Sequence, residues 1–325
     1  MLRTRRILRR HRIATNGSGR AEKTPAAAFD VVGFGLNCID HVCVVKRLPR
    51  LDSKQPLVTY DVQPGGQVPT ALVALQRWGL RTAYVGSFGD DAGGVLARSS
   101  LAIEGVDLAA TEVRPNTAQQ VAVILVDEIS GERSVLSQRV DALVLRAHEV
   151  PGDMIQSGRV LLMDAVDLPA AIDAACAAQA AGVMTVLDTD TPAPGIEALL
   201  QRTDILIVGA EFPACLTGRS DLRSALRAAA RLGPWFVGVT LGAGGALAYV
   251  RGEFYYVPAY RVSAIDSTGA GDIFHAGAIY GVLQGWPVSA TLRFAAAAAA
   301  LKCEKLGGRT GIPTMERARQ LAQIG

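Results

Sequence analysis

The stretch that decides the fold reads Asp266-Ser267-Thr268-Gly269-Ala270-Gly271-Asp272. A strand-like run, Tyr260 to Ala264, comes just before it, and an apolar run with helical character, Gly271 to Gln284, overlaps its end. Small residues at positions 269 to 271 let the backbone approach a ligand closely, and the free N–H groups and dipole of a helix N-terminus attract an anion. The stretch therefore predicts a strand, a phosphate-binding turn and a helix, in that order.

Asp272 falls in the first turn of that expected helix. One interpretation is that it caps the helix, as aspartate often does there. The other is catalytic: a carboxylate beside an anion hole accepts the proton of an attacking hydroxyl. The backbone amides of Gly269, Ala270 and Gly271 would then stabilise the charge that develops on a transferred phosphoryl group.

Outside this stretch, strand-like and helix-like segments alternate along the chain. Strands are expected at 30–35, 83–86, 160–163, 184–187, 205–208, 235–240 and 246–249, and helices at 68–78, 92–104, 168–180, 271–284 and 288–303. This alternation predicts an α/β fold with a mostly parallel central sheet and helices on both faces. Two β-rich stretches, at about 40–62 and 112–138, interrupt it, and we expect them to form a small β-sheet lid over a cleft.

Composition limits the classes of function. Half of the 325 residues are hydrophobic and the net charge is +3, and no basic stripe with interleaved aromatic residues indicates a nucleic-acid partner. No apolar run is long enough to cross a membrane. Five cysteines without a CxxC pair argue against disulfides and structural zinc, and favour the cytoplasm. Six arginines in the first dozen residues make 1–28 a basic extension, which we expect to be disordered, ahead of a domain at 29–325.

A dinucleotide-binding turn is an alternative for the first strand. Gly33 and Gly35 match the beginning of the G-x-G-x-x-G fingerprint, but its third glycine would fall at Cys38, where no helix clearly opens. The pattern therefore disfavours a nicotinamide-dependent dehydrogenase.

From about Asp30 to Gln323 the chain resembles the ribokinase-like (PfkB-type) carbohydrate kinases, because the D-x-x-G-A-G-D heptad and several further turns occur in the same order. The resemblance implies ATP-dependent phosphorylation of a sugar hydroxyl, with Mg²⁺. Stretches at 181–188, 293–295 and 301–309 are similar to the sulfofructose kinase and ketohexokinase-like branch. That similarity implies a ketose or a modified ketose as substrate.

The resemblance also implies a substrate site near the N-terminus of the domain. Gly65 and Gly66 match the family's Gly-Gly turn, and Asp40 matches the aspartate that binds sugar hydroxyls; a turn residue remains the alternative for Asp40. Gln67 and Thr70 stand where the family has sugar-contacting asparagines, which leaves the substrate open. Arg139 is a further expectation, as a contact for an anionic substrate group, with a solvated arginine as its alternative.

The nucleotide site is expected at the turn Thr240 to Gly245, where Thr240, Gly242 and Gly245 match the family's T-x-G-x-x-G pattern. Glycines there would let backbone amides approach phosphates. The loop at 307–313 matches the family's segment near the adenine and includes Gly308. The resemblance further implies a potassium site formed by the main-chain carbonyls of five residues. They are Asp266, Thr268, Lys302, Gly307 and Gly311.

The magnesium motif departs from the family pattern N-x-x-E, because the asparagine is absent and Glu211 falls one residue early. Glu211 either serves Mg²⁺ in a related way or is a helix N-terminal glutamate favoured by the dipole. Asp188 and Asp190, after a strand, are alternative carboxylates for a water-mediated Mg²⁺ site.

Two other functions stay open at this point. A nucleoside kinase would use the same scaffold, and a catalytically silent sugar-binding regulator would explain the missing asparagine. Pairing of lid sheets in the family also implies a homodimer formed through the lid.

Overall fold

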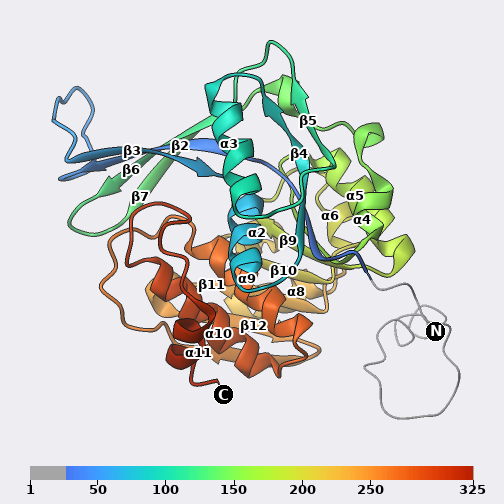
Figure 1. Cartoon of the computed structure of the whole chain (residues 1–325). Helices are drawn as coiled ribbons and strands as arrows, with labels where there is room; N and C mark the ends of the chain where they lie inside the picture. The colour runs from blue at the N-terminus through green and yellow to red at the C-terminus, as the bar shows by residue number, and fades with distance from the viewer. Residues whose placement is uncertain (1–26, 325) are drawn as a thin grey trace, which may run out of the picture.

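A computed structural model describes residues 27–324 (Figure 1). Its centre is a nine-stranded sheet in which seven neighbouring strands pair in parallel, and β12 and β13 are added at one edge through antiparallel pairs. In spatial order the strands are β13 (Glu253–Val257), β12 (Ala246–Val250), β11 (Phe236–Thr240), β10 (Ile205–Gly209), β9 (Met184–Thr189), β8 (Gly158–Asp164), β1 (Phe29–Phe34), β4 (Thr82–Gly89) and β5 (Thr111–Arg114). The predicted α/β class with a mostly parallel sheet is confirmed.

Helices cover both faces of this sheet because side chains alternate along each strand. Val31 packs into the core under one helical layer, whereas Val32 packs into the core under the other. The first layer comprises α2 (Gln67–Arg77), α3 (Ala92–Ile103), α9 (Ala270–Leu283), α10 (Val288–Lys302) and α11 (Met315–Ala322). The second comprises α4 (Gly152–Gln156), α5 (Leu168–Ala181), α6 (Glu197–Leu200), α7 (Phe212–Thr217) and α8 (Leu222–Ala230). Three single-turn 3₁₀ helices complete the elements: η1 (Asp141–Leu143), η2 (Ala147–Glu149) and η3 (Gly242–Gly244).

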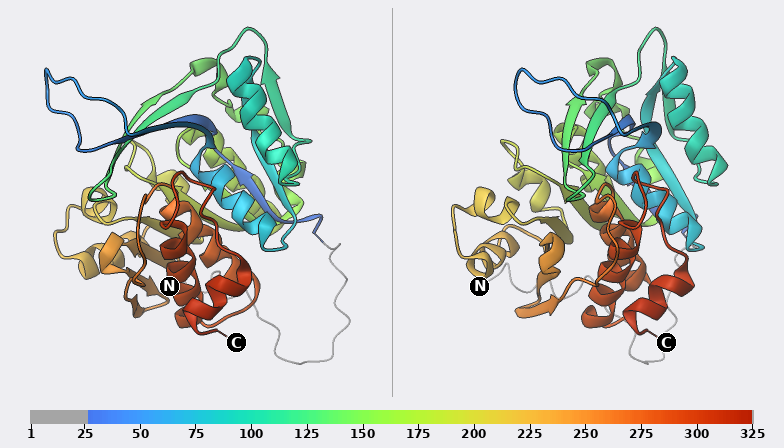
Figure 2. Two further views of the ribbon diagram at one scale, coloured as in Figure 1. Left: turned by 60° about the vertical axis from the view of Figure 1, so that its left-hand side comes forward. Right: turned by 90° about the vertical axis from the view of Figure 1, so that its left-hand side faces the viewer.

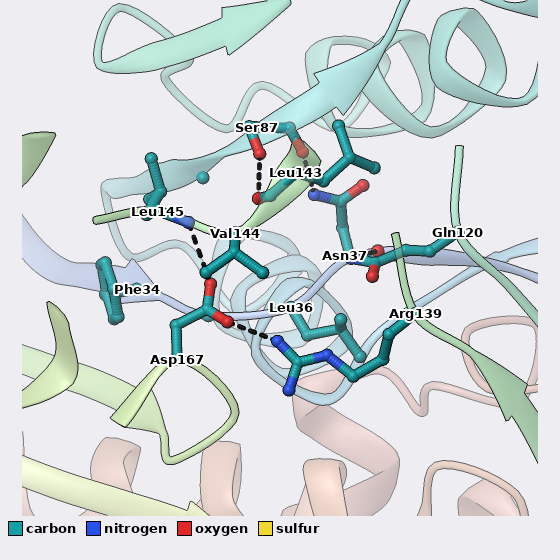
Figure 3. A pocket seen from close by; sticks show the side chains of 12 residues that line it. Phe34, Leu36, Asn37, Ser87, Gln120, Arg139, Leu143, Val144, Leu145 and Asp167 are labelled. Carbon is teal, nitrogen blue, oxygen red and sulfur yellow. Dashed lines mark hydrogen bonds and ion pairs between the residues drawn. The ribbon is translucent and has the colours of Figure 1, made fainter. Parts of the chain in front are cut away.

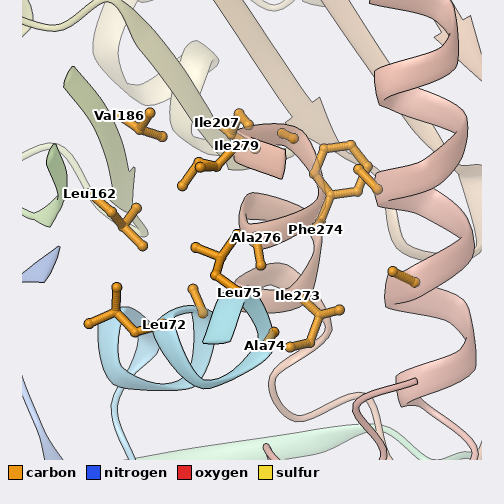
Figure 4. Close-up of a cluster of buried hydrophobic side chains, with 14 of the residues drawn as sticks. Leu72, Ala74, Leu75, Leu162, Val186, Ile207, Ile273, Phe274, Ala276 and Ile279 are labelled. Carbon is orange, nitrogen blue, oxygen red and sulfur yellow. The ribbon is translucent and has the colours of Figure 1, made fainter. Parts of the chain in front are cut away.

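The packing of α2 and α9 sets the position of the site. Figure 4 shows Leu72 and Leu75 of α2 facing Ile273 and Ala276 of α9 beneath the sheet. A side chain at Gly33 of β1 would place its Cβ 2.5 Å from the Leu72 side chain. Glycine at this position therefore lets α2 lie close against the strand, and the two helices begin at the same edge of the sheet.

A second, four-stranded sheet extends away from the body (Figure 2). Its order is β3 (Thr59–Gly65), β2 (Cys38–Val45), β6 (Val121–Asp127) and β7 (Arg133–Gln138). One face packs a small apolar cluster around Val42 and Ile124. This is the small sheet expected as a lid, with one difference: β5, which overlaps the start of the expected stretch 112–138, pairs with β4 at the edge of the large sheet.

One local expectation was wrong. Tyr260 to Ala264 forms no strand, because this segment pairs with no other strand in the described part of the chain. The two residues that follow it, Ile265 and Asp266, are held at the C-terminal end of α10. Their N–H groups donate to the carbonyl oxygen of Cys303 at 2.8 and 3.2 Å. The segment therefore enters the heptad as a loop fixed at its far end.

Two classes of protein were disfavoured by the sequence: nicotinamide-dependent dehydrogenases and proteins that span a membrane. Cys38 begins strand β2 rather than a helix, which removes the helix that a dinucleotide-binding fingerprint requires. None of the helices in residues 27–324 combines the length and apolar character needed to cross a bilayer. The expected disordered extension, 1–28, lies outside the described residues except for positions 27 and 28.

Candidate active site

The predicted site residues come together at one edge of the large sheet, where the parallel strands end. Asp164 closes β8 and lies opposite Asp188 near the end of β9. The heptad turn at the start of α9 faces the same edge. Ligands of open parallel sheets bind at these carboxyl ends, so the topology itself places the heptad beside two acidic strand ends.

The heptad turn has the geometry of an anion-binding loop. Gly269 is the N-cap of α9 with φ of 78°, and a Cβ there would lie 2.8 Å from the Cα of Gly308. The amide of Ala270 donates to the carbonyl of Ser267 at 3.1 Å, so it is not available to a ligand, contrary to expectation. Within residues 27–324 the amides of Gly269 and Gly271 have no such partner. These two groups remain as donors for an anion.

Asp272 does not cap its helix. It lies in the first turn of α9, whose N-terminus has no side-chain hydrogen bond. Burial, together with the charge of Asp188, raises the pKa of Asp272 to about 7, although His275 and Arg133 act in the opposite direction. A carboxyl group with a pKa near neutral is suited to accept a proton at physiological pH.

A buried acid–histidine pair lies behind Asp272. The Nδ1 atom of His275 lies 3.3 Å from Oδ2 of Asp188 and 2.8 Å from the carbonyl oxygen of Gly271, and Nε2 lies 2.9 Å from the carbonyl of Ile207. Burial raises the pKa of Asp188 well above its usual value. His275, which the sequence did not single out, therefore ties the strand β9 carboxylate to the first turn of α9.

Asp40 lies at the base of the small sheet, on β2. Its side chain is 7% exposed and accepts a hydrogen bond from the thiol of Cys38 at 3.2 Å. Burial raises its pKa, while Cys38 and the guanidinium of Arg309 lower it. A Cβ on Gly65, opposite Cys38 in the hairpin, would lie 2.2 Å from Asp40 Oδ1. Glycine is required there to leave room for the carboxylate.

The second glycine of the turn is required for a different reason. Gly66 adopts φ of 95°, and a Cβ would lie 2.5 Å from the carbonyl oxygen of Leu36. Gln67 begins α2 directly after it and donates from Nε2 to the carbonyl oxygen of Asp188 at 3.0 Å. The turn therefore connects the Asp40 carboxylate to the end of β9.

Arg309 is a buried member of this site that sequence reasoning missed. Its guanidinium donates to the carbonyl of Gly65 at 3.1 Å, to the hydroxyl of Ser100 at 3.0 Å and to that of Thr70 at 3.4 Å. Burial lowers its pKa to about 10 despite the opposing charges of Asp40 and other acids. Thr70, expected at the sugar, thus has its hydroxyl bonded to Arg309.

Arg139 lines a pocket beside β1 with Asn37, Gln120 and Asp167 (Figure 3). Its guanidinium pairs with Asp167 at 2.5 Å and donates to the carbonyl of Val166 at 2.9 Å. Asn37, which the sequence did not single out, donates to the hydroxyl of Tyr84 at 2.8 Å. An anionic ligand group would therefore meet an arginine whose charge is already paired.

The expected nucleotide turn follows β11. Thr240 ends that strand, and Gly242 has φ of 55° with open space where a Cβ would stand. Gly245 has φ of 86°, and its Cβ would lie 2.1 Å from the carbonyl oxygen of Val257. Glu211 is exposed at the N-terminus of α7, after β10, and makes no capping hydrogen bond. The turn and Glu211 thus follow adjacent strands of the sheet.

Comparison with protein-family models decides the family. Residues 28–315 match the pfkB family carbohydrate kinases. The chain belongs to this family. It is 29% identical over 289 residues to a ribokinase of Haemophilus influenzae, covering 85% of this chain and 93% of that protein. It is 24% identical to a 5-dehydro-2-deoxygluconokinase of Shouchella clausii, covering 91% and 96%. The structure of an Arabidopsis thaliana ribokinase with ribose and ATP superposes with a TM-score of 0.77 at 25% identity, covering 92% and 100%.

The family assignment confirms the predicted ribokinase-like fold and the predicted reaction class. The protein is a carbohydrate kinase, a phosphotransferase with an alcohol group as acceptor. ATP binding follows from the family.

The five residues expected around potassium converge in this carbohydrate kinase. The backbone amide and hydroxyl of Thr268 donate to Oδ1 of Asp266 at 2.8 and 2.7 Å, and the amide of Gly307 donates to Oδ2 at 2.7 Å. A Cβ on Gly311 would lie 2.1 Å from the carbonyl oxygen of Lys302. The side chain of Lys302 also enters this region, where its Nζ donates to the carbonyl of Asp266 at 2.9 Å.

Proposed function

We propose that this carbohydrate kinase transfers the γ-phosphoryl group of ATP to a hydroxyl of a sugar held between the small sheet and the heptad turn. The observation that carries the proposal is the state of Asp272. Its side chain does not cap α9, its pKa is about 7, and it lies one residue from the free amide of Gly271. A base beside an anion hole is the arrangement that phosphoryl transfer to a hydroxyl requires.

The proposed reaction assigns one task to each group. Asp40, buried and fixed by Cys38, accepts hydrogen bonds from sugar hydroxyls. Asp272 takes the proton of the attacking hydroxyl as its oxygen bonds to the γ-phosphorus and the bond to the β-phosphate oxygen breaks, which releases ADP. The amides of Gly269 and Gly271 donate to the transferred group. Thr240, Gly242 and Gly245 bind the nucleotide, with Gly308 beside the heptad turn.

Mg²⁺ fits the acidic strand ends. Among residues 27–324 no three His, Cys, Asp or Glu side chains cluster as a metal site, and Mg²⁺ bound to nucleotide typically keeps several waters and needs one or two carboxylates. Asp188, with a pKa raised by burial, and the exposed Glu211 are the groups proposed to serve it. When bound, Mg²⁺ would neutralise phosphate charge.

The five free cysteines support a cytoplasmic location.

For the acceptor we propose a ketose or a modified ketose. Gln67 is committed to β9 and Thr70 to Arg309, so neither offers a free amide to the sugar as an asparagine would. The similarity to a 5-dehydro-2-deoxygluconokinase, whose name describes a keto sugar acid, supports this class. Arg139 would contact an acidic group of such a substrate after releasing Asp167.

The test is ADP release by the purified protein against ribose, fructose, keto sugar acids, sulfonated ketoses and nucleosides. Asp272→Ala is expected to lose on the order of 10²–10⁴ in rate on the best substrate. Asp153→Ala, at an exposed aspartate in the first turn of α4, is the matched control and should keep wild-type rates. Wild-type transfer by a folded Asp272→Ala protein would refute the proposed base. If only nucleosides are phosphorylated, the acceptor is a nucleoside and the proposed sugar substrate is wrong.

The outer face of the small sheet is proposed to form a homodimer. A row of directly paired residues, Val62, His41, Val123 and Leu136, crosses all four strands. Val62 is 38% and Leu136 59% exposed, and Tyr60 nearby is 54% exposed. Between the exposed apolar side chains of the two edge strands lie the half-buried His41 and Val123. Exposed apolar side chains on a sheet face favour association with a second copy.

A further inference from the structure

Lys302 is the last residue of α10, and its side chain is fully buried, with 0% of its surface exposed. Lysine is almost never fully buried unless its charge is paired. The ammonium has one hydrogen-bond acceptor within residues 27–324, the main-chain carbonyl oxygen of Asp266 at 2.9 Å. Burying an ammonium group with a single acceptor costs desolvation free energy, so we expect this charge to have a function.

The ammonium lies at the base of the heptad turn. Asp266 opens the heptad, and its carboxylate accepts from the amide and hydroxyl of Thr268 and from the amide of Gly307. Burial lowers the pKa of Lys302, while the nearby charges of Asp266 and Asp272 raise it. Lys302 thus places positive charge under the turn whose free amides are proposed to bind phosphate, with Asp266 as its counter-charge.

The same position is the one expected for potassium. A second cation bound to the Asp266 carbonyl would lie next to the ammonium in a fully buried site, where the repulsion between two positive charges is only weakly screened. The residues present therefore do not fit a potassium ion in addition to Lys302. This differs from the expectation that the five carbonyls coordinate K⁺.

We propose that the Lys302 ammonium acts as a tethered monovalent cation: it holds the Asp266 carbonyl, orders the heptad turn for phosphate, and makes phosphoryl transfer independent of potassium. Lys302 is a positioning residue, since it acts through Asp266 and the turn. The inference rests on the proposed phosphoryl transfer, and it extends that proposal to ion dependence.

The first measurement uses the wild-type protein in buffers whose monovalent cation is K⁺, Na⁺ or tetramethylammonium. The kcat/KM for ATP is expected to agree within about twofold among the three. The melting temperature and the calorimetric Kd for ATP should likewise not respond to K⁺. A rate that falls tenfold or more without K⁺ would overturn the inference but leave the kinase assignment intact, whereas inactivity in every buffer on every acceptor would count against the proposed function.

The second measurement uses Lys302→Ala, which leaves space for an ion, with Lys305→Ala as control because Lys305 is exposed in the turn that follows α10. In tetramethylammonium, Lys302→Ala should lose at least tenfold in kcat/KM, and K⁺ or NH₄⁺ should restore part of the loss. K⁺ should also raise its melting temperature and tighten ATP binding. Full activity without small cations, or a loss that no cation restores, would overturn the inference.

If Lys302→Ala does not fold, the wild-type measurement still decides. Potassium independence with an unfolded variant supports a required internal charge, and potassium dependence refutes it. Lys302→Met, which keeps the bulk of the stem without the charge, then provides the folded comparison. It should be inactive in every cation, because its side chain fills the space that a rescuing ion would need.

Discussion

Substitution of Gly65 by alanine would test whether the Gly-Gly turn positions the carboxylate of Asp40, the residue proposed to bind the sugar. The added Cβ would lie 2.2 Å from Oδ1 and 2.4 Å from Cγ of Asp40, whereas such contacts essentially never fall below 3.0 Å. The carboxylate must therefore retreat by roughly 1 Å, and a misplacement of about 1 Å costs on the order of 10²-fold in rate. Cys38 and Arg309 adjoin Asp40, so it has little room to move without losing its own contacts.

The assay is steady-state ADP release with the best acceptor and with ATP varied separately. Because the clash lies at the acceptor site, kcat/KM for the sugar should fall by about 10²-fold, and KM for ATP should stay near the wild-type value. Gly152→Ala is the control, since the nearest atom to its Cβ is 4.0 Å away. A folded Gly65→Ala protein with wild-type sugar kinetics would refute the role of Asp40.

Three further predictions concern other parts of the molecule. Because Asp272 must be ionised and its pKa is about 7, kcat/KM should rise about tenfold from pH 6 to pH 8 and then level off; a flat profile over this range would contradict the assignment. Gly245→Ala combines a positive φ with a Cβ 2.1 Å from the Val257 carbonyl, and urea unfolding should show a loss of about 2 kcal/mol or more; an unchanged midpoint would exclude the clash. A Tyr60→Glu, Leu136→Glu double variant should sediment as a monomer where the wild type sediments as a dimer, and a wild-type monomer would end the dimer proposal.

Much of the fold could be predicted because the signals are local. Helix α3 was expected at 92–104 and spans Ala92–Ile103, with Asp91 as the N-cap that accepts from the amide of Gly94 at 2.8 Å. The heptad was predicted to open a helix, and α9 begins at Ala270. Spacing, capping residues and glycine turns act over a few positions, so one sequence displays them.

The parts that could not be predicted depend on contacts between distant positions. Arg309 reaches Thr70 and the carbonyl of Gly65 across more than 200 residues, and the Lys302 side chain reaches a carbonyl 36 residues earlier. The segment at 260–264 has the alternation of a strand but lacks a partner strand. Its state depends on what lies beside it, which local pattern does not record.

The hairpin of β2 and β3 has a consequence for the evolution of substrate specificity in this enzyme. It supplies both Asp40 and the Gly-Gly turn, whereas the nucleotide turn after β11 and the heptad at α9 come from the other half of the chain. In the proposed function, the acceptor and the phosphoryl donor are therefore bound by separately encoded segments. With these proposed roles, substitutions within the hairpin would alter which sugar is accepted and leave the ATP site unchanged.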